Sequence, residues 1–311
     1  MPEPMRYPTR SAAMVVAATT LAVTGLAACG SANPPGSAAT IPPVTSSPTP
    51  QALSAVIKAV NSTLSVTSAF DMTFSRSSSS GASATPSRAS GAVDFRGPSG
   101  TIRIDLPGAG GGTERMVFLP DTVFIKPPAS TPPLQAGRPW IFANFADIAK
   151  FKINFPPYIV QTESINPAFT LNELAWGSTS AVPAGQTEFG GEQTASYLVT
   201  VDLGQALSHA TGPAVDVFSQ ALSAEISATG GGATGPPVTI AIEVWVGRSG
   251  QLVGARVTPP NAGIGTITLA LNGFGTSVHA DKPPRGQVVD LAGMIPGAEQ
   301  EALNNGDTDG A

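Results

Sequence analysis

Segments in which apolar residues alternate with other residues run through most of this chain, and they constrain its fold more than any other feature. The longest covers residues 238–246, where every second position is apolar: Val238, Ile240, Ile242, Val244 and Val246. This period of two is typical of a strand with one buried face. The turn sequence at 247–250 then predicts a hairpin into a second strand at 252–257.

The same period marks strands elsewhere in the chain. Residues 66–74 and 101–106 alternate clearly, with Asp71 and Arg103 among the polar positions. Shorter patterns predict further strands at 91–96, 114–119, 122–126, 186–189, 193–202, 263–274 and 276–282. Because short turns join many of these segments, neighbouring strands should pair in antiparallel fashion.

Helical spacing is seen in four places. The first helix should begin at Pro50 with Thr49 as its N-cap, since apolar residues then recur every three or four positions up to Leu64. Further helices are expected at 144–155, 167–176 and 215–228. The Ser-rich run 77–90 and the Pro-rich run 127–139 are interpreted as loops. Together these patterns predict the α+β class, with one long antiparallel sheet and helices packed on one face.

The first 28 residues have the features of a secretion signal. Arg6 and Arg10 precede an uncharged stretch, residues 11–25, that is too short to span a bilayer. The residues before Cys29 are Leu26, Ala27 and Ala28, and this arrangement resembles a bacterial lipobox. Cys29 is the only cysteine of the chain, which excludes an internal disulfide. We therefore expect cleavage before Cys29, diacylglycerol and acyl groups such as palmitate on its thiol, and a lipid anchor on the extracytoplasmic face of the cell membrane.

The remaining chain divides by composition into three parts. Residues 29–49 are rich in Pro and Ser and should form a semi-rigid tether. Residues 50–292 carry the periodic patterns and should form the folded domain, whereas residues 293–311 are acidic and are expected to be a flexible tail.

Five segments together resemble the mycobacterial LppX/LprG-type lipoproteins, which share a LolA-like fold. They are residues 121–126 (DTVFIK), 137–141 (GRPWI), 197–203 (YLVTVDL), 244–253 (VWVGRSGQLV) and 274–284 (FGTSVHADKPP). The resemblance covers about residues 50–292. This chain departs from the family pattern through the insertions at 77–90 and 127–139.

The resemblance implies an open half-barrel, a curved sheet with helices on its concave face and an apolar cavity between them. It also implies that an acylated lipid or lipoglycan of the cell envelope is the ligand, with no catalytic residue. The apolar positions that could line such a cavity are Val66, Phe70, Met72, Phe74, Ile102, Ile104, Ile242 and Val244. The same side chains could equally form a filled core.

Composition argues against several other functions. The net charge of −5 disfavours nucleic acid as a partner. His209 and His279 are the only histidines, and no Gly-x-Ser-x-Gly motif occurs. The two Gly-rich runs, 108–112 and 230–235, do not lead from a strand into a helix, as a phosphate-binding loop would. We therefore expect no enzymatic activity, no metal and no cofactor beyond the acyl groups on Cys29.

Two functional hypotheses follow. The first is a membrane-anchored protein that binds or carries an acylated envelope lipid in an apolar cavity. The alternative is a non-enzymatic scaffold with a filled core, which would bind another envelope protein through the loop at 127–139 with Trp140, or through an exposed sheet edge.

Overall fold

A computed structural model describes residues 47–74, 86–107, 111–131, 133, 135–144, 166–210, 238–258 and 266–291. All of them belong to one compact unit, Val44–Ala311. The predicted helices at 215–228 and, apart from Asn144, at 144–155 lie outside the described residues, as does Cys29.

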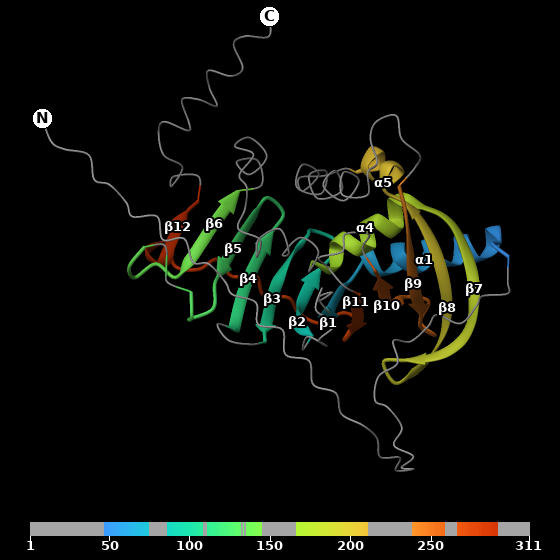
Figure 1. The fold of residues 1–311 in the computed structure, drawn as a ribbon, viewed down its shortest axis with the longest axis horizontal. Helices are drawn as coiled ribbons and strands as arrows, with labels where there is room; N and C mark the ends of the chain where they lie inside the picture. Colours follow the sequence, from blue (N-terminus) through green and yellow to red (C-terminus); the bar gives the residue numbers. More distant parts are fainter. Residues whose placement is uncertain are drawn as a thin grey trace, which may run out of the picture. The chain divides into compact units, whose positions relative to one another are not determined.

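A single twelve-stranded sheet dominates this unit (Figure 1). Its strand order is β12-β6-β5-β4-β3-β2-β1-β11-β10-β9-β8-β7, and every pairing is antiparallel except that of β12 with β6. The strands are β1 (Thr67–Phe74), β2 (Ser87–Asp94), β3 (Ser99–Leu106), β4 (Gly112–Leu119), β5 (Thr122–Lys126), β6 (Trp140–Asn144), β7 (Ser178–Phe189), β8 (Glu192–Asp202), β9 (Thr239–Val246), β10 (Leu252–Val257), β11 (Ile267–Asn272) and β12 (Val288–Asp290). The two edge strands do not pair with each other, so the sheet stays open.

Three α-helices are described: α1 (Pro50–Leu64), α4 (Pro167–Gly177) and α5 (Leu203–His209). A short 3₁₀ helix, η1 (Arg285–Gln287), precedes β12. α1 packs on β7 and β10, and it also contacts α4, which lies against β7 and β8. β7, β8 and β9 curve around α1 and α4 (Figure 1). The predicted α+β fold, an open curved antiparallel sheet with helices on its concave face, is therefore confirmed. We call this helix-bearing face the inner face.

The predicted start of α1 is also confirmed. The Thr49 side chain accepts a hydrogen bond from the Ala52 amide at 3.1 Å, and Pro50 occupies the first turn. The Thr49 amide donates in turn to the Ala181 carbonyl of β7 at 3.2 Å. This contact ties the beginning of the helix to the sheet edge. α4 repeats the arrangement, with Asn166 as its cap and Pro167 after it.

Several boundaries differ from the sequence prediction. β2 begins at Ser87, inside the run predicted as a loop, because the small side chains of Ser87 and Ala89 are buried opposite Phe74 and Met72. β7 extends over twelve residues despite Pro183. A proline is tolerated there because an edge strand has one row of unpaired backbone groups.

The end of the sheet was predicted wrongly in two places. The strand expected at 276–282 is absent, and this segment instead runs from β11 in the middle of the sheet toward β12 at its edge. It pairs with no strand because it connects two distant positions of the sheet. β6 and β12 were not predicted. The first four residues of β6 are all apolar and show no alternation, and the three residues of β12 are too few to show a period.

Candidate ligand-binding face

The inner face carries an apolar stripe that crosses eight neighbouring strands. Strand register places one residue of each strand in this stripe, in the order Tyr197, Val244, Ala255, Leu269, Met72, Ala89, Ile104 and Glu114. Seven of these eight residues are hydrophobic, and the last is a carboxylic acid. A parallel row passes through Leu271, Phe70, Gly91, Ile102 and Met116.

Most of the residues predicted to line a cavity lie on this face. Six of them are at most 2 % exposed and belong to one hydrophobic cluster: Phe70, Met72, Ile102, Ile104, Ile242 and Val244. Phe74 is half-buried and packs against the cluster. Val66 lies in the connection before β1. The assignment of these residues to a lipid cavity stays a prediction.

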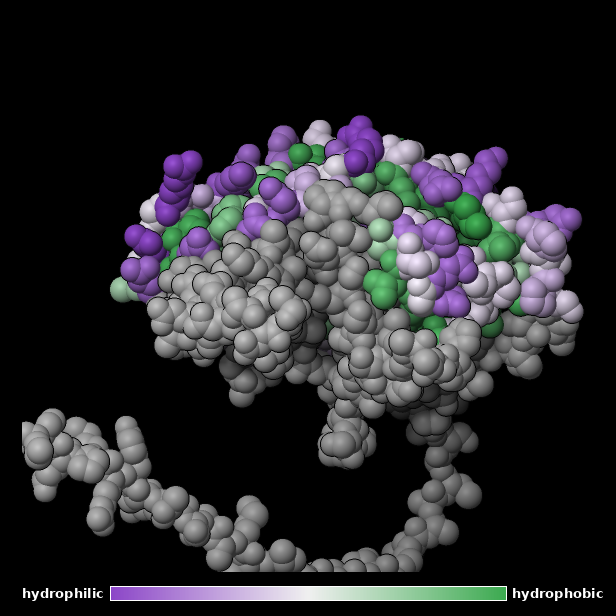
Figure 2. Space-filling model, turned by 90° about the horizontal axis from the view of Figure 1, so that it is seen from above, coloured by the Kyte–Doolittle hydropathy of each residue, from purple (hydrophilic) through white to green (hydrophobic). Residues whose placement is uncertain are grey.

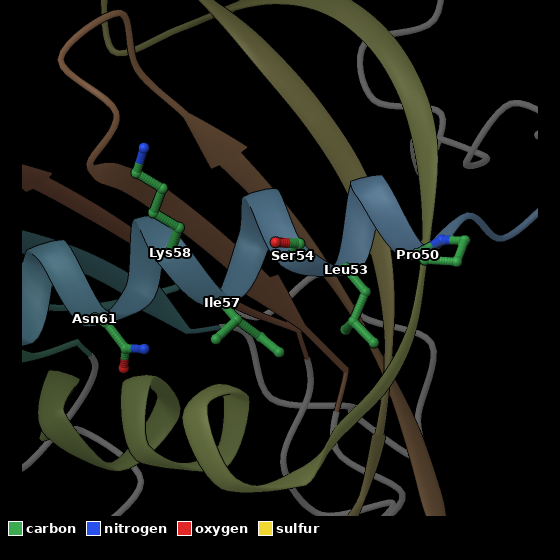
Figure 3. Close-up of a pocket in the computed structure, with 6 residues that line it drawn as sticks. All are labelled: Pro50, Leu53, Ser54, Ile57, Lys58 and Asn61. Atoms are coloured by element: carbon green, nitrogen blue, oxygen red, sulfur yellow. The ribbon is translucent and has the colours of Figure 1, made fainter.

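An open groove of about 560 Å³ runs along α1. The described residues that line it follow helical spacing: Pro50, Leu53, Ser54, Ile57, Lys58 and Asn61. Leu53, Ile57 and Asn61 point to the side on which α4 lies, whereas Lys58 points away from it (Figure 3). α1 therefore has one face buried on the sheet, through Val56 and Val60, and a second face that presents two aliphatic side chains to a groove.

Glu114 is a buried charged residue of the sheet that sequence analysis missed. Its side chain is 3 % exposed on the inner face, and burial raises its pKa to about 7 because the charged form loses its hydration. The alternation of Glu114, Met116 and Phe118 could have revealed it, since that period puts all three side chains on one face.

On the opposite face of the sheet, two aromatic rings and an arginine pack together. Phe189, from the β7–β8 hairpin, stacks on Trp245 with ring centroids 4.1 Å apart. The guanidinium of Arg256 lies 5.1 Å from the Trp245 ring and pairs with Glu243 at 2.9 Å. This arrangement explains the burial of Trp245 without a ligand.

On the face seen in Figure 2, apolar residues lie in separate groups between polar ones.

Within the part of the chain that the structure describes, neither histidine joins a cluster of metal-ligating side chains. His209 is exposed at the end of α5, where its Nδ1 lies 3.0 Å from the Gln205 carbonyl, and His279 is exposed in the segment after β11. Among the described residues, no three His, Cys, Asp or Glu side chains gather as metal ligands would. No described helix is long and apolar enough to cross a membrane.

Comparison with known proteins found similarity in structure alone. No protein-family model and no curated protein sequence matches the chain. Among solved structures, the lipoprotein LprF from Mycobacterium bovis is 13 % identical with a TM-score of 0.43, over 76 % of this chain and 99 % of that one. The Mycobacterium tuberculosis lipoprotein LppX is 14 % identical with a TM-score of 0.42, over 75 % and 99 %.

A LolA superfamily protein from Nitrosomonas europaea is 10 % identical with a TM-score of 0.28, over 75 % of this chain and 94 % of that one. The type of lipoprotein that the sequence resembles is thus represented among the similar structures. At these identities and TM-scores the likeness is one of fold.

Proposed function

We propose that this chain is an envelope lipoprotein, anchored by acyl groups on Cys29, that binds an acylated lipid against the inner face of its sheet. The observation that carries this proposal is the continuous apolar stripe from Tyr197 to Ile104. Burial of acyl chains there would be driven by removal of apolar surface from water, at about 25 cal/mol per Å².

The length of the stripe supports an acyl ligand. The apolar part of the stripe crosses seven strands, which extend over roughly 29 Å at a spacing of about 4.8 Å. The hydrocarbon core of a bilayer is about 30 Å thick and holds two acyl chains end to end. The stripe is therefore long enough for two acyl chains placed end to end.

The alternative is a scaffold with a filled core, and one observation favours it. Phe70, Met72 and Ile242 are at most 1 % exposed and belong to the same cluster as α1 and α4 residues. A carrier must keep a hollow between these layers, whereas a scaffold needs none.

Native mass spectrometry with solvent extraction of the chain from Thr49 onward tests the choice, after expression in a mycolic-acid-bearing bacterium. A discrete co-purified lipid would support the carrier. A clean protein that takes up neither a fluorescent fatty acid nor the uncharged fluorophore N-phenyl-1-naphthylamine would favour the scaffold.

Two variants of β1 locate the binding face. Met72→Trp fills the inner stripe and should abolish lipid uptake, whereas Thr73→Trp places the same indole ring on the exposed opposite face and should leave uptake unchanged. Thermal melting of both variants identifies any loss that is due to unfolding. Normal uptake by a folded Met72→Trp variant would show that the pocket lies elsewhere.

A further inference from the structure

Glu114 closes the apolar stripe at the end that lies farthest from Tyr197. It pairs in register with Ile104 of β3, and it points to the same face as Ala89 and Met72 beyond. On its other side, the β5 ladder ends where Lys126 pairs with Arg115, so no β5 residue stands opposite Glu114. The Glu114 carboxyl therefore lies at the end of the apolar stripe, next to the point where the pairing of β4 with β5 stops.

The charged residues near Glu114 point to the opposite face of the sheet. Arg103, Arg115 and Lys126 pair with one another in the adjacent register row. Asp105 is held there by Arg103 at 3.1 Å and accepts from the Thr113 hydroxyl at 2.8 Å. Within the described residues, no cationic side chain faces the Glu114 carboxyl, and desolvation is the sole cause of its raised pKa.

A buried carboxyl without a partner is costly. The group must either stay protonated, or receive hydrogen bonds that replace its lost hydration. The apolar neighbours Ile104, Met116 and Ala89 supply no donor, and no hydrogen bond to this carboxyl is found among the described residues. Of the described side chains, only the Thr122 hydroxyl is completely sealed from solvent without a hydrogen bond, so the Glu114 oxygens keep a small contact with solvent. A leucine would fill the same position at lower cost, so the carboxyl needs an explanation beyond packing.

We propose that Glu114 receives the polar head of an amphiphile whose head group donates a hydrogen bond, such as a hydroxyl or an ammonium, while its acyl chain lies along the stripe. The inference rests on the proposed lipid-binding function and adds a head-group preference to it. A neutral or cationic donor satisfies the carboxylate, whereas an anionic head would place a second negative charge beside it. The face should therefore discriminate against fatty-acid carboxylates.

Comparing the affinities of three ligands that share a ten-carbon chain distinguishes recognition of the head group from burial of the chain. Decanol, decylamine and decanoate are titrated against the full chain carrying the apolar fluorophore N-phenyl-1-naphthylamine at about pH 8.5. Binding of the fluorophore reports an apolar site, and displacement gives the affinity of each ligand. We expect decanol and decylamine to bind about tenfold more tightly than decanoate, the ratio that one charge-assisted hydrogen bond supports.

The variant Glu114→Gln keeps the shape of the side chain and removes its charge. It should strengthen decanoate binding and weaken decylamine binding, each by about tenfold. Asp105→Asn is the matched control, because it removes a carboxylate from the neighbouring strand on the opposite face. This control should leave all three affinities unchanged.

The wild-type protein offers a second measurement that needs no variant to fold. At about pH 6 the Glu114 carboxyl is mostly protonated, so discrimination against decanoate should shrink while that ligand stays largely ionised. The proposal is overturned if the fluorophore binds but neither Glu114→Gln nor low pH changes the head-group order, or if Asp105→Asn acts equally. Failure of the fluorophore to bind would instead reject lipid binding itself.

Discussion

At the scale of single residues, the Glu114 carboxyl links stability to pH. Its pKa lies near 7 in the folded chain, above the ordinary value of 4.5, because burial disfavours the charged form. The folded state thus binds more protons than the unfolded state between these two values. The contribution of Glu114 to stability is fully present below about pH 4.5 and is lost as the pH rises through 7.

We expect Glu114→Gln to remove this dependence. The shift corresponds to at most about 3.5 kcal/mol between low and high pH, at about 1.4 kcal/mol per pKa unit. Urea unfolding at about pH 5 and pH 8 should show the wild type losing more stability than the variant over this interval. An equal loss in both proteins would mean that the carboxyl is hydrated or paired in the folded state.

At the scale of elements, the β7–β8 hairpin is fastened to the sheet by an aromatic ring placed over a glycine. Gly254 of β10 lies beneath the Phe189 ring, and a β-carbon at this position would overlap that ring. Phe189 in turn stacks on Trp245 of β9. The absence of a side chain at Gly254 therefore permits a contact between three strands.

Gly254→Ala should displace Phe189 and destabilise the fold by about 1–3 kcal/mol, the usual cost of overpacking. In a Phe189→Ala background most of that cost should disappear, although the Leu269 carbonyl, 3.0 Å from the added carbon, still retains part of it. Chemical unfolding of the single and double variants measures the coupling, and near-ultraviolet circular dichroism follows Trp245. Equal cost in both backgrounds would contradict this account.

At the scale of the whole molecule, the sheet is open but its edges are protected. The β7 edge contains Pro183 and a register shift between Pro183 and Gly185, and Thr49 occupies the Ala181 carbonyl. The other edge is the three-residue β12. Short, irregular edge strands hinder pairing with a strand of another chain. The edges of this sheet are therefore poor sites for a protein partner that binds by adding a β-strand.

The proposed anchor is tested on the complete chain. Cys29→Ser should abolish incorporation of labelled palmitate and release the protein from the membrane fraction, because a serine hydroxyl cannot form the thioether. Wild-type protein grown in parallel is the control. Incorporation of palmitate into the variant would place the modification at another residue.

Sequence periodicity was a good guide to this fold where one face of an element is buried. The strands at β1, β3, β9 and β10 and the start of α1 were predicted because their apolar residues repeat with a fixed period. Periodicity failed where contacts with an adjacent strand, and not the local sequence, determine the structure. Ser87 and Ala89 form a strand because Phe74 and Met72 cover them, and β12 exists because β6 offers it a partner.

The candidate site was predicted in part. Phe70, Met72, Ile102, Ile104, Ile242 and Val244 were identified, since their period places them on one face. The order of the strands could not be read from any local pattern, and that order alone brings Val244 and Glu114 into one stripe. The sequence by itself determined which face of each strand is apolar, through the two-residue repeat of the backbone. Only the tertiary structure decided that these faces join and end at a buried carboxyl, because strand pairing is a contact between residues far apart in the chain.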